Sequence, residues 1–303
     1  QENMKVLMIT GDKSFGPGHQ RYDLQRAAVE SLEVMYWGPN NLFPRIPKGP
    51  FDVVTAQDPF IRGHLAAHIA WWFGAELNLQ VHTELSAYSR VKRAWAGFNL
   101  RNASSVRVVS EKIKTQVEKM GVCVPIHVLP IFIDVEKYKT IEHKPHAQKT
   151  ILWVGRFEDE KDPMLAIEIL KNVRQKGIDA KLIMLGAGST KNELEKHAKN
   201  FPIEFPGWRD TLPYLKVADV VLSTSLHESY GASIVEALAA GVPVVAPDVG
   251  IAKEAGAIVV DRSELAGAVC DVLRNSPRGE LKISLPTRDE WAKRWRESLV
   301  LPL

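Results

Sequence analysis

The chain has 303 residues, about the length of two domains, and its 45% hydrophobic and 25% charged content is ordinary for a globular protein. This composition excludes disordered and collagen-like chains. The 39 Lys and Arg residues nearly balance the 36 Asp and Glu residues. The resulting net charge of +3 gives no argument for nucleic acid as a partner.

The two cysteines, Cys123 and Cys270, lie far apart in the sequence and suit a reducing compartment better than a disulfide framework. Nothing in the sequence resembles the paired ligand spacing of a zinc site. The most apolar long stretch, 65–75, is shorter than the ~20 residues of a membrane-spanning helix. Residues 4–10 have the pattern of a buried strand rather than of a signal peptide. We therefore expect a cytoplasmic protein.

The first half of the chain alternates short β-rich runs with amphipathic stretches, which is typical of parallel α/β sheets. Strands are predicted at 5–10, 33–37, 51–55, 77–81, 106–110 and 126–129, and helices at about 20–32, 60–73, 87–100 and 111–120. The polar segment 130–149, which contains Pro145, shows no clean period and is the predicted linker.

The second half repeats this alternation without a tandem sequence repeat. Strands are predicted at 150–154, 180–185, 203–205, 220–223 and 243–245, and helices at about 163–176, 192–199, 232–240, 264–273 and 287–299. Two such α/β units predict a ligand cleft between the carboxyl ends of two sheets. In the last helix Trp291 and Trp295 stand four residues apart, which indicates a packing stripe.

The segment 227–246 is the densest candidate for a ligand site. It places Glu228 on a strand-to-helix loop and Glu236 inside the following helix. If the loop folds over the start of the helix, both carboxylates can face one elongated ligand. The free backbone N–H groups at the helix start, near Tyr230 and Gly231, favour phosphate. The alternative is a solvated loop glutamate followed by an ordinary amphipathic helix.

A second candidate opens the second half, where Arg156 follows a predicted strand and Lys161 follows an acidic run. A guanidinium at the carboxyl edge of a sheet can donate two hydrogen bonds to phosphate oxygens. Two cations and a helix N-terminus could neutralise a diphosphate leaving group without metal, and the chain has no Asp-x-Asp pair. The alternative for Arg156 is a surface salt bridge to Glu158 or Asp159.

Residues 151–260 resemble the donor-binding domain of family-4, retaining, GT-B-fold glycosyltransferases. The matching segments are 154–157, 185–188, 205–208, 218–223, 228–236 and 241–246. Each segment alone is weak evidence, but their order and spacing over about a hundred residues make the resemblance specific.

The first half resembles this family more loosely. The Gly16–Pro17–Gly18 loop after the first strand is similar to the family's glycine-rich loop near the donor phosphate, although its spacing is not a Rossmann fingerprint and a plain turn is the alternative. His82 is similar to a strand-end histidine near the reaction centre; a structural histidine is the alternative. The region 20–52 is shorter than in the family, and the segment 131–132 departs from its usual pattern.

The resemblance implies an α/β GT-B fold: two Rossmann-like domains whose parallel sheets face a cleft, with a C-terminal helix crossing back to the first domain. The implied boundaries are 1–140 for a shortened acceptor-side domain, 141–280 for the donor-binding domain and 281–303 for the last helix. The implied donor-binding residues are Gly16, Gly18, Arg156, Lys161, Gly186, Gly207, Trp208, Glu228, Ser229, Tyr230, Gly231 and Glu236. The implied catalytic residues are His82, Arg156, Lys161 and Glu228, and no metal ligand is implied.

The resemblance also assigns roles within this set. Arg156 and Lys161 would hold the diphosphate, and the backbone of residues 229–231 would donate N–H groups to it. Glu236 would accept hydrogen bonds from the ribose hydroxyls, and Glu228 would contact the sugar. The backbone at 207–208 would line the base.

The implied reaction is transfer of a hexose or N-acetylhexosamine from a nucleoside-diphosphate sugar, UDP- or GDP-linked, with retention at the anomeric carbon and without a metal cofactor. The acceptor would be a glycan, a lipid-linked molecule or a small molecule. The alternatives are a GT-B sugar-nucleotide epimerase and a non-catalytic nucleotide-sugar-binding subunit.

A further candidate surface is the predicted helix around residues 90–101, where basic residues alternate with aromatic ones. Arg90, Lys92, Arg93 and Trp95 would suit contact with the cytoplasmic face of a membrane and a lipid-linked acceptor. The alternative is a solvated face with buried aromatic side chains.

Overall fold

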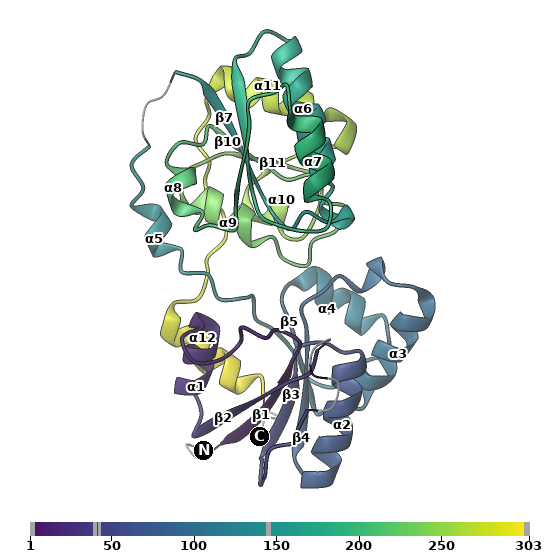
Figure 1. Cartoon of the computed structure of the whole chain (residues 1–303). Coiled ribbons are helices and arrows are strands. Elements are labelled where there is room, and N and C mark those ends of the chain that lie inside the picture. The colour runs from purple at the N-terminus through teal and green to yellow at the C-terminus, as the bar shows by residue number, and fades with distance from the viewer. Residues whose placement is uncertain (1–3, 39–40, 42–43, 144–146, 300–303) are drawn as a thin grey trace. The chain divides into compact units, whose positions relative to one another are not determined.

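The computed structural model describes residues 4–38, 41, 44–143 and 147–299. The chain forms two compact units (Figure 1). Unit 1 comprises Gln1–Phe132 and Pro286–Leu303, and unit 2 comprises Ile133–Leu285. The chain therefore enters unit 2 once and returns to unit 1 for its last helix. The units change near, but not at, the boundaries expected at 140 and 280.

Unit 1 is built on a parallel six-stranded sheet with the order β2-β1-β3-β4-β5-β6. Its strands are β1 (Lys5–Thr10), β2 (Ser31–Tyr36), β3 (Val53–Ala56), β4 (Glu76–Val81), β5 (Ser105–Val108) and β6 (Ile126–Val128). The interior strand β1 is buried from Val6 onward, as expected for a parallel sheet that is covered on both faces.

Helices cover both faces of this sheet. They are α1 (Gln20–Ala27), α2 (Ile61–Phe73), α3 (Arg90–Arg101), α4 (Glu111–Glu118) and α12 (Arg288–Glu297), with a 3₁₀ turn η1 (Leu85–Ala87). Because right-handed crossovers lead from β3 through β4 and β5 to β6, α2, α3 and α4 lie side by side on one face, and α1 and α12 lie on the other (Figure 1). Ser89 and Ser110 cap α3 and α4 by accepting backbone N–H bonds.

The last helix belongs to the core of unit 1. Trp291 and Trp295 are fully buried against Val6, Met8 and Leu24 and their neighbours. The Trp291 Nε1 donates to the carbonyl of Pro130 at 2.7 Å. A capping box at Thr287 starts the helix.

Unit 2 contains a second parallel six-stranded sheet, with the order β12-β11-β10-β7-β8-β9. Its strands are β7 (Lys149–Val154), β8 (Ala180–Leu185), β9 (Ile203–Gly207), β10 (Val220–Leu222), β11 (Val244–Ala246) and β12 (Ile258–Val259). The strand order reverses direction on either side of β7 and β10, which is where doubly wound sheets bind ligands.

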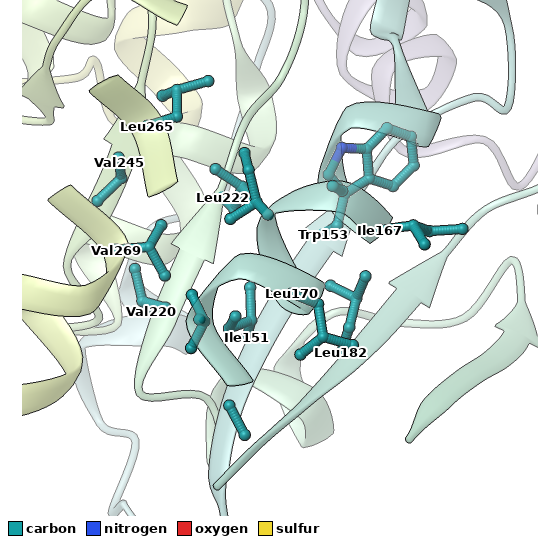
Figure 2. Packing of buried hydrophobic residues seen from close by; sticks show 14 of the residues in the cluster. Ile151, Trp153, Ile167, Leu170, Leu182, Val220, Leu222, Val245, Leu265 and Val269 are labelled. Atoms are coloured by element: carbon teal, nitrogen blue, oxygen red, sulfur yellow. The ribbon is translucent and has the colours of Figure 1, made fainter. Parts of the chain in front are cut away.

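The helices of unit 2 are α5 (Glu136–Lys139), α6 (Pro163–Gln175), α7 (Lys191–Ala198), α8 (Leu212–Leu215), α9 (Ala232–Ala239), α10 (Ala252–Ala255) and α11 (Leu265–Asn275), with 3₁₀ turns η2 (Asp159–Lys161) and η3 (Arg262–Glu264). Figure 2 shows the core under α6 and α11, where Ile167 and Val269 face sheet residues such as Ile151 and Leu222.

The structure differs from the predicted elements in several places. The helix α1 ends at Ala27 rather than at 32, because Ser31 and Leu32 pair with β1, and Leu32 is buried in the sheet core. The predicted linker contains α5, whose Tyr138 is only 2% exposed, while residues 144–146 of that segment lie outside the described residues. The two-residue strand β12 was not predicted. Within the described residues, no helix is long and apolar enough to cross a membrane.

The burial of Trp291 predicts that unit 1 depends on its last helix. Trp291→Ala should lower the free energy of unfolding by about 3–5 kcal/mol, because it leaves a large cavity. Chemical denaturation measures the loss. Trp72→Ala is the matched control, since Trp72 is 78% exposed and should change stability little. Equal effects of the two variants would contradict the packing role.

Candidate active site

The loops that follow β7 and β10 bring two of the predicted residues together at one edge of the sheet in unit 2. The two strands are neighbours and parallel, so their carboxyl ends meet at the same edge. There the Lys161 Nζ lies 2.5 Å from the Glu228 Oε1, and the Ser225 hydroxyl donates to the same oxygen at 3.0 Å. Both charged side chains are more than four-fifths buried. The ion pair is therefore largely shielded from solvent.

Further hydrogen bonds fix these two loops to each other. The buried Thr224 hydroxyl lies 2.8 Å from the carbonyl oxygens of Lys161 and Asp162 and accepts from the Trp153 Nε1 at 2.9 Å. The Leu226 N–H donates to the carbonyl of Glu160 at 2.8 Å. These bonds hold the ion pair in place through the backbone.

A second cation, Arg262, bridges the same two loops. It donates to the carbonyl of Thr224 and to the carboxylate of Asp162. Asp162 also caps α6 by accepting from the Leu165 N–H, and it does so in a left-handed backbone conformation with φ of 43°. The loop after β7 is therefore fixed at its end.

Arg156 lies on the outer part of the loop after β7. Its side chain is 60% exposed and pairs with Glu160. The alternative interpretation expected a salt bridge to Glu158 or Asp159, and that choice of partner was wrong, because the 3₁₀ turn η2 brings Glu160 onto the side of Arg156. Glu158 instead accepts from the backbone N–H and hydroxyl of Ser189, and these bonds lower the pKa of Glu158.

The helix α9 begins at Gly231, whose backbone is left-handed with φ of 98°. Glycine adopts this conformation without strain, so the first-turn N–H groups follow directly after the loop that carries Glu228. The Tyr230 side chain is buried, and this burial raises the pKa of Tyr230. Its carbonyl accepts from the Ile251 N–H at 3.0 Å, and Ser229 beside it is partly buried.

Glu236 belongs to a separate cluster, inside α9. Its Oε2 accepts from the Thr211 hydroxyl at 2.8 Å, and the Tyr138 hydroxyl lies 3.2 Å from the same Thr211 oxygen. Burial raises the pKa of Glu236, although hydrogen bonds from Thr211 and Tyr138 and the charge of Lys137 act in the opposite direction. Burial and the nearby Glu236 carboxylate also raise the pKa of Tyr138. No sequence motif marks Thr211, and the sequence analysis missed it.

The other predicted residues of unit 2 are Gly186, Gly207 and Trp208. The backbone geometry at the two glycine positions requires a residue without a side chain or one that tolerates a positive φ. A Cβ on Gly186 would lie 1.8 Å from the carbonyl oxygen of Gly155, so the loops after β7 and β8 approach closely only with glycine there. Gly207 has a φ of 80° and accepts from the Gly186 N–H at 3.1 Å. Trp208 is 55% exposed next to it.

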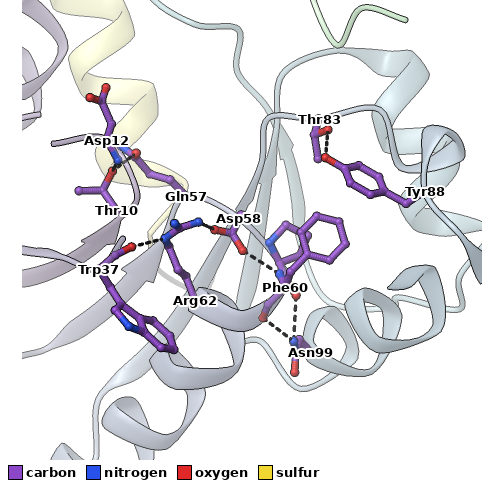
Figure 3. Close-up of polar contacts among 11 residues, drawn as sticks. Thr10, Asp12, Trp37, Gln57, Asp58, Phe60, Arg62, Thr83, Tyr88 and Asn99 are labelled. Carbon is purple, nitrogen blue, oxygen red and sulfur yellow. Dashed lines mark hydrogen bonds and ion pairs between the residues drawn. The ribbon is translucent and has the colours of Figure 1, made fainter. Parts of the chain in front are cut away.

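In unit 1, the predicted loop and histidine both follow strands at the carboxyl edge. The loop with Gly16 and Gly18 comes after β1 and leads into α1, and Gly18 is left-handed with φ of 87°. His82 directly follows β4 and lines a cavity of about 420 Å³ together with Phe60, Tyr88 and Trp95. Figure 3 shows the edge of this cavity, where the Thr83 and Tyr88 hydroxyls lie 3.1 Å apart.

Hydrogen bonds between loops stabilise the carboxyl edge of the sheet beside this cavity (Figure 3). Arg62 donates to the carbonyl of Trp37 at 2.8 Å and to Asp58 at 2.7 Å. Asn99 of α3 donates to the carbonyl of Phe60 at 3.0 Å. The ends of β2 and β3 and the helices α2 and α3 are thereby joined around the cavity.

A buried arginine determines the state of His82. Arg107, on β5, is 1% exposed, and its Nη1 contacts the Gln80 Oε1 at 2.8 Å and the His82 Nε2 at 3.4 Å. Its other N–H groups donate to the carbonyls of Leu129 and Pro130. A guanidinium has no acceptor, so a hydrogen bond in this contact requires the His82 Nε2 to accept, with the proton of the neutral ring on Nδ1.

Electrostatics agree with this assignment. Burial, together with the charges of Arg107 and Arg21, lowers the pKa of His82 well below its usual value. His82 is therefore a neutral hydrogen-bond donor rather than a cation. The other residues of β5 are apolar or small, so a charged residue in this strand is the one sequence signal that could have identified Arg107.

In the part of the chain that the structure describes, no group of three or more His, Cys, Asp or Glu side chains is placed to hold a metal ion.

Comparisons with known proteins agree with this organisation. Residues 148–275 match the family model described as Glycosyl transferases group 1. The alpha-monoglucosyldiacylglycerol synthase of Streptococcus pneumoniae is 27% identical over 268 residues, which are 75% of this chain and 60% of that protein. The chain thus spans less than two thirds of the length of that relative.

Two further relatives extend the comparison. The GDP-mannose-dependent alpha-(1-6)-phosphatidylinositol dimannoside mannosyltransferase of Mycobacterium tuberculosis is 30% identical over 141 residues, covering 43% of this chain and 37% of that protein. Among solved structures, Anabaena HepE in complex with UDP and glucose superposes with a TM-score of 0.71 at 16% identity, covering 98% of this chain and 96% of that one. This likeness extends over both units and shows their fold, that of GT-B proteins with two Rossmann-like domains.

The raised pKa of Glu236 predicts a pH-dependent stability. A carboxyl group whose pKa is higher in the folded than in the unfolded state stabilises the fold when protonated, and this contribution is lost as the pH rises through the folded pKa. The amide of Glu236→Gln does not ionise, so this variant does not lose stability by deprotonation at this position. Its free energy of unfolding should therefore rise relative to that of the wild type as the pH increases from acidic to neutral. Thermal unfolding over this range measures the difference. The exposed Glu168→Gln serves as control, and a pH-independent difference for Glu236→Gln would contradict the prediction.

Proposed function

We propose that the chain is a retaining glycosyltransferase of family 4 that uses a nucleoside-diphosphate sugar as donor, because residues 148–275 match the family model described as Glycosyl transferases group 1. The observation that carries the proposal is the junction of the Lys161–Glu228 pair with the start of α9 at the carboxyl edge of β7 and β10. A cation, a carboxylate and the backbone N–H groups of a helix start in one place suit a sugar joined to a diphosphate.

The roles of the donor-site residues follow from their chemistry. Lys161 and Arg156 neutralise the diphosphate, and the backbone N–H groups from Ser229 to Gly231 donate to its oxygens. When a donor binds, Lys161 exchanges part of its contact with Glu228 for phosphate, which releases the Glu228 carboxylate toward the sugar hydroxyls. The stabilisation of the departing diphosphate is the largest catalytic contribution.

Glu236 receives the ribose. A carboxylate can accept hydrogen bonds from two neighbouring hydroxyls, and Thr211 and Tyr138 hold the side chain in one orientation. The Gly207–Trp208 backbone lines the base. UDP- and GDP-linked sugars are the donors we favour, since the M. tuberculosis relative is GDP-mannose-dependent and the HepE complex contains UDP.

The transfer proceeds by front-face attack. The bond between the anomeric carbon and the phosphate oxygen breaks, and the acceptor oxygen forms a new bond to that carbon on the same face. The acceptor proton passes to the leaving phosphate oxygen, so retention needs no carboxylate nucleophile. His82, as a neutral Nδ1–H donor, orients hydroxyl groups without adding a charge.

Unit 1 carries the acceptor side of the reaction. Its cavity beside His82 has aromatic walls formed by Phe60, Tyr88 and Trp95, which suit the faces of a sugar ring. A lipid-linked acceptor is favoured over a free glycan, because the names of the two sequence relatives described above contain a diacylglycerol and a phosphatidylinositol lipid. We further propose that the protein is cytoplasmic and touches the membrane peripherally through α3.

Metal removal tests the charge arrangement. Activity should persist in excess EDTA, because Lys161, Arg156 and the start of α9 neutralise the diphosphate. Sugar transfer or slow donor hydrolysis is measured with and without the chelator. Complete loss that Mg²⁺ or Mn²⁺ restores would overturn the proposal of metal-independent transfer.

Lys161→Ala should weaken binding of UDP or GDP by about 1–3 kcal/mol, the scale of a hydrogen bond to a charged group, and leave binding of uridine or guanosine nearly unchanged. Titration calorimetry measures both ligands. Lys181→Ala is the matched control, since Lys181 pairs with Glu204 at 2.9 Å away from the β7–β10 edge. An equal loss for nucleoside and nucleotide would show that Lys161 acts on folding or on base binding instead.

A further inference from the structure

The predicted membrane-facing residues of α3 do not all lie on one face of the helix. At about 100° per residue, Arg90, Arg93 and Arg101 share one face of the helix. That face lines a groove toward α4, whereas Lys92 and Trp95 line the cavity beside His82. The basic and aromatic residues of α3 are therefore divided between the groove and the cavity.

The groove between α3 and α4 combines cations with an apolar floor. It has a volume of about 560 Å³, and Arg90, Arg93, Arg101 and Lys119 line it. Ala94, Gly97, Met120 and Leu85 supply apolar surface, and no acidic side chain contributes to the lining. A groove of this composition suits an anion that is attached to an apolar body.

Within the described ranges, the cations that line the groove have no carboxylate partner at ion-pair distance. Among the described residues, Arg90, Arg93 and Lys119 form no ion pair, and Arg101 contacts only the carbonyl of Met120, at 2.8 Å. The lysines of α4 that form ion pairs are Lys112 and Lys114 instead. Like charges that are gathered without a counter-charge repel one another, so an anion in the groove would relieve that repulsion.

Exposed apolar side chains stand beside the groove. Val91 and Phe98 of α3 are 79% and 54% exposed, and they lie about a quarter turn from the groove-lining face. On the neighbouring helix α2, Trp71 and Trp72 are 84% and 78% exposed. Each of α2, α3 and α4 connects two neighbouring parallel strands, so their C-terminal ends lie at the same end of the sheet. Trp71 and Trp72 are in the last turn of α2, and Phe98 and Arg101 are in the last turn of α3.

We propose that the groove between α3 and α4 binds the phosphate head group of an anionic membrane lipid, while Phe98, Val91 and the tryptophans of α2 enter the membrane interface. The groove thus acts as a head-group site separate from the acceptor cavity. The inference rests on the proposed membrane contact, and not on the donor chemistry of unit 2. The exposed tryptophans favour a lipid over a free phosphate, because tryptophan is enriched at membrane interfaces.

Sedimentation with phosphatidylglycerol-containing vesicles tests this site through two variants with the same charge change. Arg93→Glu reverses a groove cation, whereas Lys92→Glu reverses the next cation on the same helix, outside the groove. A cation near an anionic surface contributes about fivefold in binding, equal to about 1 kcal/mol. Arg93→Glu and Lys119→Glu should each weaken vesicle binding by about fivefold or more, and Lys92→Glu by clearly less.

Three comparisons complete the experiment. Wild-type binding should fall as salt rises and be weak for phosphatidylcholine vesicles, because surface charges are screened over about 8 Å at physiological ionic strength. The double variant Trp71→Ala/Trp72→Ala should weaken binding at high and low salt alike. Thermal unfolding with and without UDP or GDP verifies that every variant is folded and reports donor binding independently.

Three results would overturn the proposal. They are a wild-type chain that stays in the supernatant at low salt, equal losses for Arg93→Glu and Lys92→Glu, and displacement from vesicles by millimolar glycerol phosphate, which would indicate a site for free anions. Absence of a thermal shift with UDP or GDP, with vesicle binding intact, would instead count against the donor proposal alone.

Discussion

The organisation of unit 2 depends on one partly buried ion pair, between Lys161 and Glu228. Removing two charges from water is costly, and attraction between them offsets that cost only where the geometry is fixed. The Ser225 hydroxyl on the carboxylate and the Thr224 bonds to the lysine's own backbone supply that geometry. The same pair keeps a cation and a carboxylate within reach of the start of α9, so the loops after β7 and β10 behave as one rigid surface.

Much of this arrangement could be predicted from the sequence, because parallel α/β sheets place strand ends at a common edge. The positions of Lys161, Glu228 and His82 after β7, β10 and β4 follow from that rule. The partners of these residues could not be predicted in the same way. Arg107 reaches His82 from a different strand, and Thr211 reaches Glu236 across 25 residues of sequence, so both contacts exist only after the chain is packed.

Local propensity failed where tertiary packing was stronger. Residues 28–32 continue the pattern of α1, yet Leu32 belongs to β2 because pairing with Val6 buries it in the sheet. Likewise, the polar segment after β6 has the composition of a linker, yet Tyr138 within it is held by Thr211 and buried against α9. In α3 the sequence shows basic and aromatic residues alternating, but only the helical geometry reveals that they divide between a groove and a cavity.

The return of the chain to unit 1 has a consequence for its biosynthesis. Unit 2 is formed from one continuous segment, 133–285, whereas the core of unit 1 needs Trp291, Trp295 and Leu299 from the far end of the chain. A ribosome therefore releases all of unit 2 before it releases the residues that close unit 1. Domains generally fold as units during synthesis, so the second half of this protein can complete its fold first, while the half that is translated first must wait for the last helix.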